Sequence, residues 1–236
     1  MTTNNKGLKR KMARREFIKK AGAGTLIMAI GGSYQLAGET LNQQAQTEVR
    51  IDGKQRLPPG QRAVESLKHM GGYPGSPRTS DFKLEVYGEV ENPFTINYDE
   101  LMKMEQVEQE ADVHCVTGWS MLGGIWSGVQ VKHLAERAGL KKTANFAIFE
   151  SYHDFTANIT ITEALKPNVL VTNRLNGKPF KQDNGAPVRS LVPDLYFWKS
   201  AKWLTGIRFV KRDLPGFWET RGFHNIGDPW KEQRYG

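Results

Sequence analysis

The stretch QVEQEADVHCVTGWSM, residues 106–121, has strand character and runs into the chain's single cysteine, Cys115. An intramolecular disulfide needs a second cysteine, so Cys115 cannot form one. Three roles stay open for it: a small buried apolar residue, a nucleophile or a metal ligand. Because the cysteine follows directly on a strand, we expect it at a strand end, where binding and catalytic residues are commonly placed.

Outward from this stretch, strands dominate and helices are short. A helix is predicted over 98–104, capped by Asn97 or Asp99, and a second over 131–140 that ends at Gly139. The remaining expectations are irregular structure over 39–80, a helical turn at 162–166, and strands over 82–90, 144–152, 154–160, 167–175, 186–193 and 202–212. This order favours an α+β or mainly β domain over a doubly wound parallel sheet.

The positive charge of the chain is concentrated at its N-terminus. The 236 residues carry a formal net charge of +8, and residues 1–20 hold eight Lys or Arg and one Glu, a local charge of +7. The rest of the chain is therefore close to neutral, at +1. A basic face for nucleic acid is not expected, because the excess charge belongs to the leader.

The N-terminal segment reads as a targeting sequence. Arg14 and Arg15, followed by Glu16-Phe17-Ile18-Lys19 and a short apolar run, resemble the twin-arginine export signal. The run is too short to cross a hydrocarbon core comfortably, although a retained leader would give weak membrane association. We expect an export signal over 1–38, a linker over 39–56, a domain over 57–236, and a periplasmic or other extracytoplasmic location.

Two segments of the last third combine cations with small polar residues. DNGAPVRSLVP (183–193) carries Arg189, and YFWKSAKW (196–203) carries Lys202 among aromatic residues. Arg offers a planar fork and Lys a point charge, so the pair is a candidate phosphate site. The alternative is a sheet edge protected by lysine, with Arg189 in a surface salt bridge.

Three long strings carry a family resemblance: CVTGWSMLGGIWSGV (115–129), NGAPVRSLVPDLYFWKSAKWL (184–204) and PGFWETRGFHNIGDPWKEQR (215–234). From about Leu57 onward the chain resembles the sulfite oxidase-like molybdopterin oxidoreductases. The resemblance implies a layered α+β fold of mixed β-sheets with short helices. It also implies a molybdenum atom held by the dithiolene of one molybdopterin and the thiolate of Cys115. The positions implied for the pterin and its phosphate are Asn184, Arg189, Ser200, Ala201 and Lys202, together with His69 and Ser151.

The same resemblance implies oxygen-atom transfer coupled to two electrons. The substrate would be a sulfur oxyanion, a small or protein-bound sulfoxide, or a related small molecule. Sulfite oxidases proper follow their cysteine with an Asn-Arg-Arg string, whereas this chain has Gly118, Trp119 and Ser120. The exported protein-methionine-sulfoxide reductases are therefore the more similar branch. Electrons would pass through a separate partner, a cytochrome or a membrane haem protein.

Two other functions are weighed. A cysteine hydrolase would use Cys115 with His114, His133 or His153 as base, but adjacent strand residues point to opposite faces, which disfavours His114. A cofactor-free binding module on the same fold would have lost Cys115 or Arg189, and both are present. His114 and His133 are expected to be structural. Trp218, His224 and Trp230 are expected to pack the C-terminal tail, and Tyr152, His153 and Tyr196 are candidates to border the metal.

Overall fold

The computed structural model describes residues 42–50, 52–72 and 77–236, so the predicted export signal lies outside the described residues. Within the described part, none of the helices is both long and apolar enough to cross a membrane. Residues 42–56, expected as a linker, include a helix over 42–47, and they contact the domain. The Arg56 guanidinium donates two hydrogen bonds to the Asp112 carboxylate, and the Trp230 indole donates to the Gln55 carbonyl.

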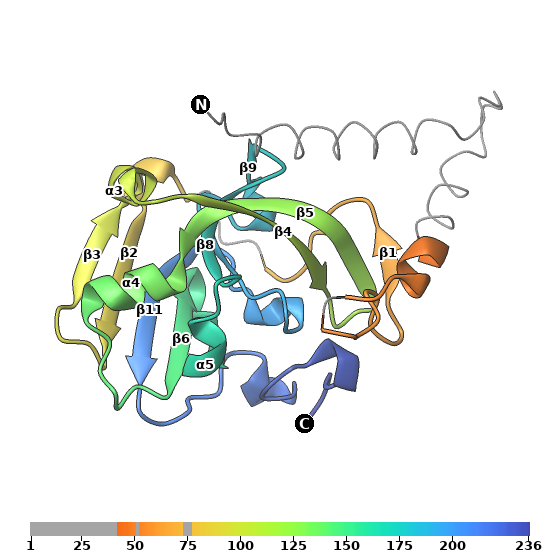
Figure 1. Ribbon diagram of the computed structural model, residues 1–236. Helices are drawn as coiled ribbons and strands as arrows, with labels where there is room; N and C mark the ends of the chain where they lie inside the picture. Colours follow the sequence, from red (N-terminus) through yellow and green to blue (C-terminus); the bar gives the residue numbers. More distant parts are fainter. Residues whose placement is uncertain (1–41, 51, 73–76) are drawn as a thin grey trace, which may run out of the picture. The chain divides into compact units, whose positions relative to one another are not determined.

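The first sheet contains the strand that leads to Cys115 (Figure 1). Its central strands run in the order β1, β5, β8, β10, while β4 pairs with β5 and β9 pairs with β8. The β1 strand is parallel to β5, and the other pairs are antiparallel. The bounds are β1 (Arg62–Val64), β4 (Val107–His114), β5 (Trp119–Gln130), β8 (Leu170–Leu175), β9 (Lys178–Pro179) and β10 (Arg189–Leu191).

The second sheet has the order β3, β2, β11, β6, β7, with a parallel pair of β11 and β2 at its centre. The bounds are β2 (Lys83–Gly88), β3 (Phe94–Asn97), β6 (Phe146–Ser151), β7 (Thr156–Thr160) and β11 (Leu204–Val210). Gly88 ends β2 at a φ of +93°, and a Cβ there would lie 2.2 Å from the carbonyl oxygen of Phe209. Only glycine allows this close approach of two strands.

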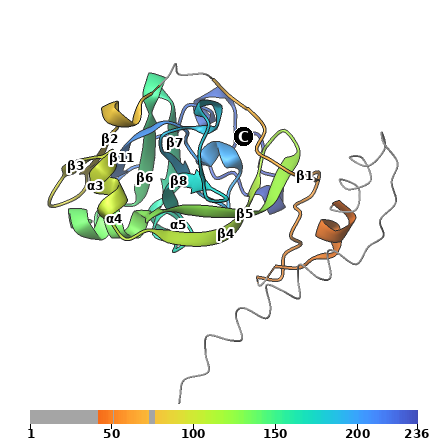
Figure 2. The ribbon, with the colours of Figure 1, turned by 90° about the horizontal axis from the view of Figure 1, so that it is seen from above.

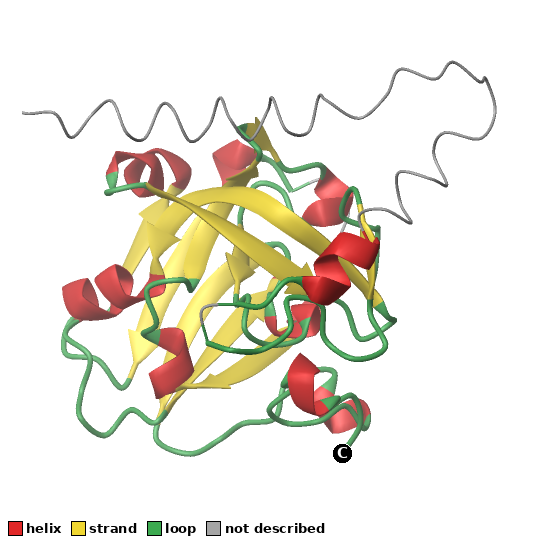
Figure 3. Cartoon of the chain, turned by 45° about the vertical axis from the view of Figure 1, so that its right-hand side comes forward, coloured by secondary structure: helices red, strands yellow, loops and turns green. Residues whose placement is uncertain are grey.

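The helices are short beside the strands of the two sheets (Figure 3). Asn97 caps α3 (Tyr98–Lys103) and forms a capping box with Glu100, which selects Asn97 over Asp99. The second helix, α4 (Val131–Ala138), ends as predicted at Gly139, which has a φ of +67°. The others are α5 (Ile161–Ala164) and single-turn 3-10 helices at Thr79–Asp81, Tyr152–Asp154, Gln182–Asn184, Phe197–Lys199, Glu219–Arg221 and Pro229–Lys231.

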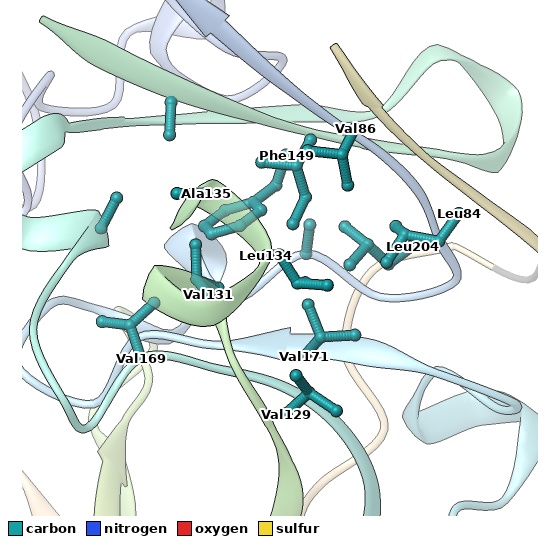
Figure 4. Close-up of a cluster of buried hydrophobic side chains, with 14 of the residues drawn as sticks. Leu84, Val86, Val129, Val131, Leu134, Ala135, Phe149, Val169, Val171 and Leu204 are labelled. Atoms are coloured by element: carbon teal, nitrogen blue, oxygen red, sulfur yellow. The ribbon is translucent and has the colours of Figure 1, made fainter. Parts of the chain in front are cut away.

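The main core lies where α4 packs between the two sheets (Figure 4). Leu134 of α4 is fully buried among side chains of both sheets. Val86 and Phe149 come from the second sheet, and Val129 and Val171 come from the first. Burying such side chains stabilises the fold by about 1.5 to 3 kcal/mol each. This core fixes the separation of the sheets, and therefore the position of the loops at their ends.

Four strands, β1, β3, β5 and β9, lie outside the sequence expectation. The largest is β5, whose alternation is interrupted by Gly123, Gly124 and Gly128. Gly128 is a packing requirement, since a Cβ there would lie 2.2 Å from the Val171 carbonyl oxygen. The short strands β1, β3 and β9 were also not predicted. The expected strand over 186–193 is reduced to β10, because only its middle residues pair with β8. The α+β prediction with mixed sheets and short helices is confirmed.

Candidate active site

One cavity is lined by residues from five separate parts of the chain. Its empty volume is about 1000 Å³, including the open mouth. Seven of the eight residues predicted for the site line it: Cys115, Ser151, Asn184, Arg189, Ser200, Ala201 and Lys202. The eighth, His69, is not part of the lining, although its neighbours Lys68 and Met70 are. The His69 ring lies 3.8 Å from the Asp183 carboxylate, at the surface.

Cys115 lies in the tight turn between β4 and β5. Its amide donates to the carbonyl of Trp119 at 2.8 Å, and its carbonyl accepts from the amide of Gly118 at 3.0 Å. Gly118 closes the turn at a φ of +90°, where a side chain would be strained. The thiol sulfur lies 3.2 Å from the hydroxyl oxygen of Thr117, and the cysteine is only 7% exposed. Thr117 was not predicted as a site residue.

The histidines do not supply a base for Cys115. His114 is fully buried, and burial lowers its pKa to about 4, so the ring is neutral at ordinary pH. Its Nδ1 lies 2.8 Å from the Ser120 hydroxyl. Neither His133 nor His153 lines the cavity. In the described chain, which includes all five histidines, no imidazole hydrogen-bonds to the thiol, so the hydrolase alternative lacks its general base.

Arg189 is buried without an ion pair among the described residues, so the surface salt bridge considered for it is wrong. Its guanidinium donates to the carbonyls of Asn184 at 3.0 Å, Ser190 at 3.3 Å and Ser200 at 2.7 Å. Burial lowers the pKa of Arg189 to about 9. The guanidinium also lies over the Phe197 ring, 4.1 Å from its centroid. A buried cation held by carbonyl dipoles and an aromatic face has no counter-charge, and it favours an anion in the cavity.

Lys202 is a second cation on the same wall. Its ammonium donates to the carbonyls of Met70 at 2.6 Å, Gly71 at 2.7 Å and Asp183 at 3.0 Å. Burial, and then the charge of Arg189, lower the pKa of Lys202 to about 7. A phosphate placed here would relieve the repulsion between the two cations.

Among the remaining predicted residues, Ser200 and Ala201 hydrogen-bond to the backbone, whereas Ser151 presents a hydroxyl near the cavity. The Ser200 hydroxyl accepts the Val192 amide at 2.8 Å, and the Ala201 carbonyl accepts the Ser190 amide at 2.9 Å. Both residues therefore brace the wall that carries Arg189. The buried hydroxyl of Ser151 has no hydrogen-bond partner among the described residues. Such a group needs a partner, and a polar ligand in the cavity would provide it.

Aromatic residues form much of the remaining wall. The aromatic residues that line the cavity are Phe155, Phe197, Trp198, Trp203, Trp218 and Phe223. Trp218 packs against Phe217 and Phe223, as expected for the tail, and it also faces the cavity. The crowding of aromatics over 196–203 was the only sequence signal for this wall, because the tail's contribution depends on tertiary contacts.

The residues of this cavity fit a molybdopterin. The two unpaired cations suit a phosphate, the rings suit a flat heterocycle, and the thiol suits a soft metal bond. The orphaned hydroxyl of Ser151 adds a polar group that a heterocycle with hydrogen-bonding edges can satisfy. In the described residues, no cluster of three or more His, Cys, Asp or Glu side chains could hold a metal ion.

Comparison with known proteins shows the family to which the chain belongs. Residues 70–218 match the model of the oxidoreductase molybdopterin binding domain. The uncharacterized oxidoreductase YuiH of Bacillus subtilis is 39% identical over 186 residues, which is 78% of this chain and 94% of that protein. The protein-methionine-sulfoxide reductase catalytic subunit MsrP of Ralstonia nicotianae is 34% identical over 171 residues, 66% of this chain. The chain spans about half of that relative, at 51% of its length.

The fold also has a solved counterpart. The sulfane dehydrogenase SoxCD of Paracoccus pantotrophus matches with a TM-score of 0.58 over 85% of this chain and 60% of the other. At 14% sequence identity this likeness shows the fold alone. The family match covers the cavity residues from Met70 to Trp218, Cys115 and Arg189 included. The chain therefore belongs to the oxidoreductases with a molybdopterin binding domain, and it is a molybdopterin-dependent enzyme with a sulfite oxidase-type fold.

Proposed function

We propose that this chain is an exported enzyme that transfers an oxygen atom at a molybdenum bound by Cys115, with a sulfoxide or a small sulfur oxyanion as substrate. The observation that carries the proposal is the shared cavity. The thiol of Cys115 and the cations Arg189 and Lys202 come from separate segments, yet all line one opening.

The bound cofactor would supply two-electron oxygen-atom chemistry, and the chain would hold and orient it. Cys115 would contribute its thiolate as the protein ligand, within hydrogen-bonding reach of the Thr117 hydroxyl. Arg189 and Lys202 would bind the pterin's phosphate. The aromatic wall would exclude water from the flat ring system.

Among the sulfur compounds, we favour a neutral sulfoxide as the substrate. The cations that line the cavity are Lys68, Arg189 and Lys202, and the proposal assigns two of them to the cofactor. After the turn, Trp119 and Ser120 are buried and cannot present charge to a substrate. Reduction of a sulfoxide consumes two electrons and two protons and releases the sulfide and one water. The similarity to MsrP, which is named for methionine sulfoxide, supports this choice.

The electrons would come from a separate partner, such as a cytochrome or a membrane haem protein. The proposal of export rests on the paired arginines ahead of a short apolar run. A twin-arginine route accepts folded proteins, so the cofactor would be inserted before export.

The decisive experiment combines metal analysis with one substitution. Protein from a cofactor-competent host is expected to contain about one molybdenum per chain and to fluoresce as a pterin after oxidation. With reduced benzyl viologen as electron donor, it should reduce methionine sulfoxide. Cys115→Ser should lose this activity, because an alkoxide is a harder ligand than a thiolate. Absence of molybdenum from the purified protein would refute the proposal.

A further inference from the structure

A glutamine that no sequence pattern singles out contacts the backbone of Cys115. Gln61 is buried, with 7% of its surface exposed, and it lies just before β1. Its Nε2 donates to the carbonyl oxygen of Cys115 at 2.9 Å. Gln61 does not line the cavity, so it acts on the site through the residues that it contacts, above all through Cys115.

The orientation of this amide is fixed by chemistry. A carbonyl oxygen only accepts hydrogen bonds, so the group that faces Cys115 must be the NH₂ of Gln61. The Oε1 atom then faces Ser120, whose hydroxyl donates to it at 3.2 Å. The hydroxyl has one proton, so His114 Nδ1, at 2.8 Å, donates to the Ser120 oxygen. A series of hydrogen bonds with one donor direction therefore runs from His114 through Ser120 and Gln61 to the carbonyl of Cys115.

These hydrogen bonds hold the turn at Cys115 from the side that its own two strands leave open. The Cys115 carbonyl accepts from both Gly118 and Gln61, which uses both of its lone pairs. The Arg62 amide donates to the Gly118 carbonyl at 3.1 Å, where β1 begins to pair with β5. Figure 2 shows β1 at the same end of the domain as the first residues of β5. The turn is thus held by its own strands and by a third segment.

We infer that Gln61 is a positioning residue: it fixes the carbonyl of Cys115, and with it the direction in which the thiol enters the cavity. The inference rests on the proposed function, in which Cys115 holds molybdenum. With the Gly118 amide as its one remaining donor, the carbonyl would let the peptide after Cys115 rotate, which would move the sulfur relative to Arg189 and Lys202. Metal sites depend on such outer groups to orient their ligands.

Two isosteric variants separate the two halves of the amide. Gln61→Met keeps the length and removes both hydrogen bonds. Gln61→Glu keeps an acceptor for Ser120 but turns an oxygen toward the Cys115 carbonyl. Gln109→Met is the matched control. Gln109 lies on β4, and its Nε2 donates to the Asn168 carbonyl at 2.7 Å, but it does not hydrogen-bond to Cys115.

The experiment uses holoenzyme and three measurements: molybdenum per chain, the Mo(V) electron paramagnetic resonance spectrum, and kcat and KM for methionine sulfoxide. Both Gln61 variants should shift the g-values and lower kcat per bound molybdenum about fivefold to tenfold, the worth of one hydrogen bond at the ligand. KM should stay unchanged, because Gln61 does not reach the substrate. The control should lower the melting temperature only.

The outcomes are distinct. Wild-type g-values and kcat in Gln61→Glu, with only thermal weakening as in the control, would overturn the inference and leave the proposed function intact. Wild-type protein without molybdenum would overturn both. If Gln61→Met gives no soluble protein, Gln61→Glu decides alone.

Discussion

Replacing Arg189 by alanine should abolish cofactor binding while changing the stability of the cofactor-free protein little. The reason is that two effects of this buried side chain oppose each other. Its pKa falls from 12.5 to about 9, and a shift of about 3.5 pH units costs about 5 kcal/mol when the charge is kept at neutral pH. Deleting the side chain removes this cost.

Against that gain stands the loss of three hydrogen bonds to the carbonyls of Asn184, Ser190 and Ser200. At about 1.5 kcal/mol each, the lower end of the range for bonds that involve a charged group, these bonds contribute about 4.5 kcal/mol. The two effects cancel to within about 2 kcal/mol, or a few degrees in melting temperature. With a phosphate bound, Arg189 becomes net stabilising, because its charge then has a counter-charge. Each charge-assisted bond to the anion contributes about 1.5 to 3 kcal/mol, which is about one to two decades of affinity.

The assay is thermal unfolding of loaded and cofactor-free protein beside molybdenum occupancy. Wild-type protein should gain melting temperature on loading, since a ligand stabilises the state that it binds. Arg189→Ala should show no gain and low occupancy, and Arg189→Lys should recover little, because the planar fork is missing. Arg208→Ala, which breaks a partly exposed ion pair between Arg208 on β11 and Glu150 on β6, should keep the full gain.

Two results would refute this reasoning. Full molybdenum occupancy in Arg189→Ala, with reduced turnover per metal, would move the residue from the cofactor's phosphate to the substrate. A large fall in the melting temperature of cofactor-free Arg189→Ala would show that its role is mainly to brace the backbone.

Three further expectations concern other residues. The pKa of Lys202 falls from 10.5 to about 7 on folding, so in cofactor-free protein the buried charge destabilises in full below pH 7. The free energy of unfolding should rise with pH between 7 and 10.5, and urea titrations showing the same slope in Lys202→Met would contradict this. Thr117→Val should shift the Mo(V) spectrum through loss of the contact with the Cys115 thiol, and Thr117→Ser should restore it; identical spectra in all three would exclude the contact. Changing Arg14 and Arg15 to lysines should hold folded protein in the cytoplasm, and cell fractionation that finds normal export would contradict the twin-arginine prediction.

Part of this protein can be read from local sequence. The strand before Cys115, a cap at Asn97 or Asp99 and the end of α4 at Gly139 follow from local patterns and backbone chemistry. The resemblance to the molybdopterin family predicted the class of cofactor and seven of the residues that line the cavity. These features are available because each depends on a few neighbouring residues.

Tertiary structure alone decided the rest. The strand β5 is hidden by glycines that are needed for contact with Val171 and other neighbours across the sheet. Arg189 could have been an exposed ion-pair residue, and only folding shows it buried against carbonyls. Gln61 and Trp218 reach the site region from opposite ends of the chain. Sequence periodicity indicates which face of an element is buried, but it does not indicate which distant segment packs against that face. The site forms where such distant segments meet, so only the tertiary structure defines it.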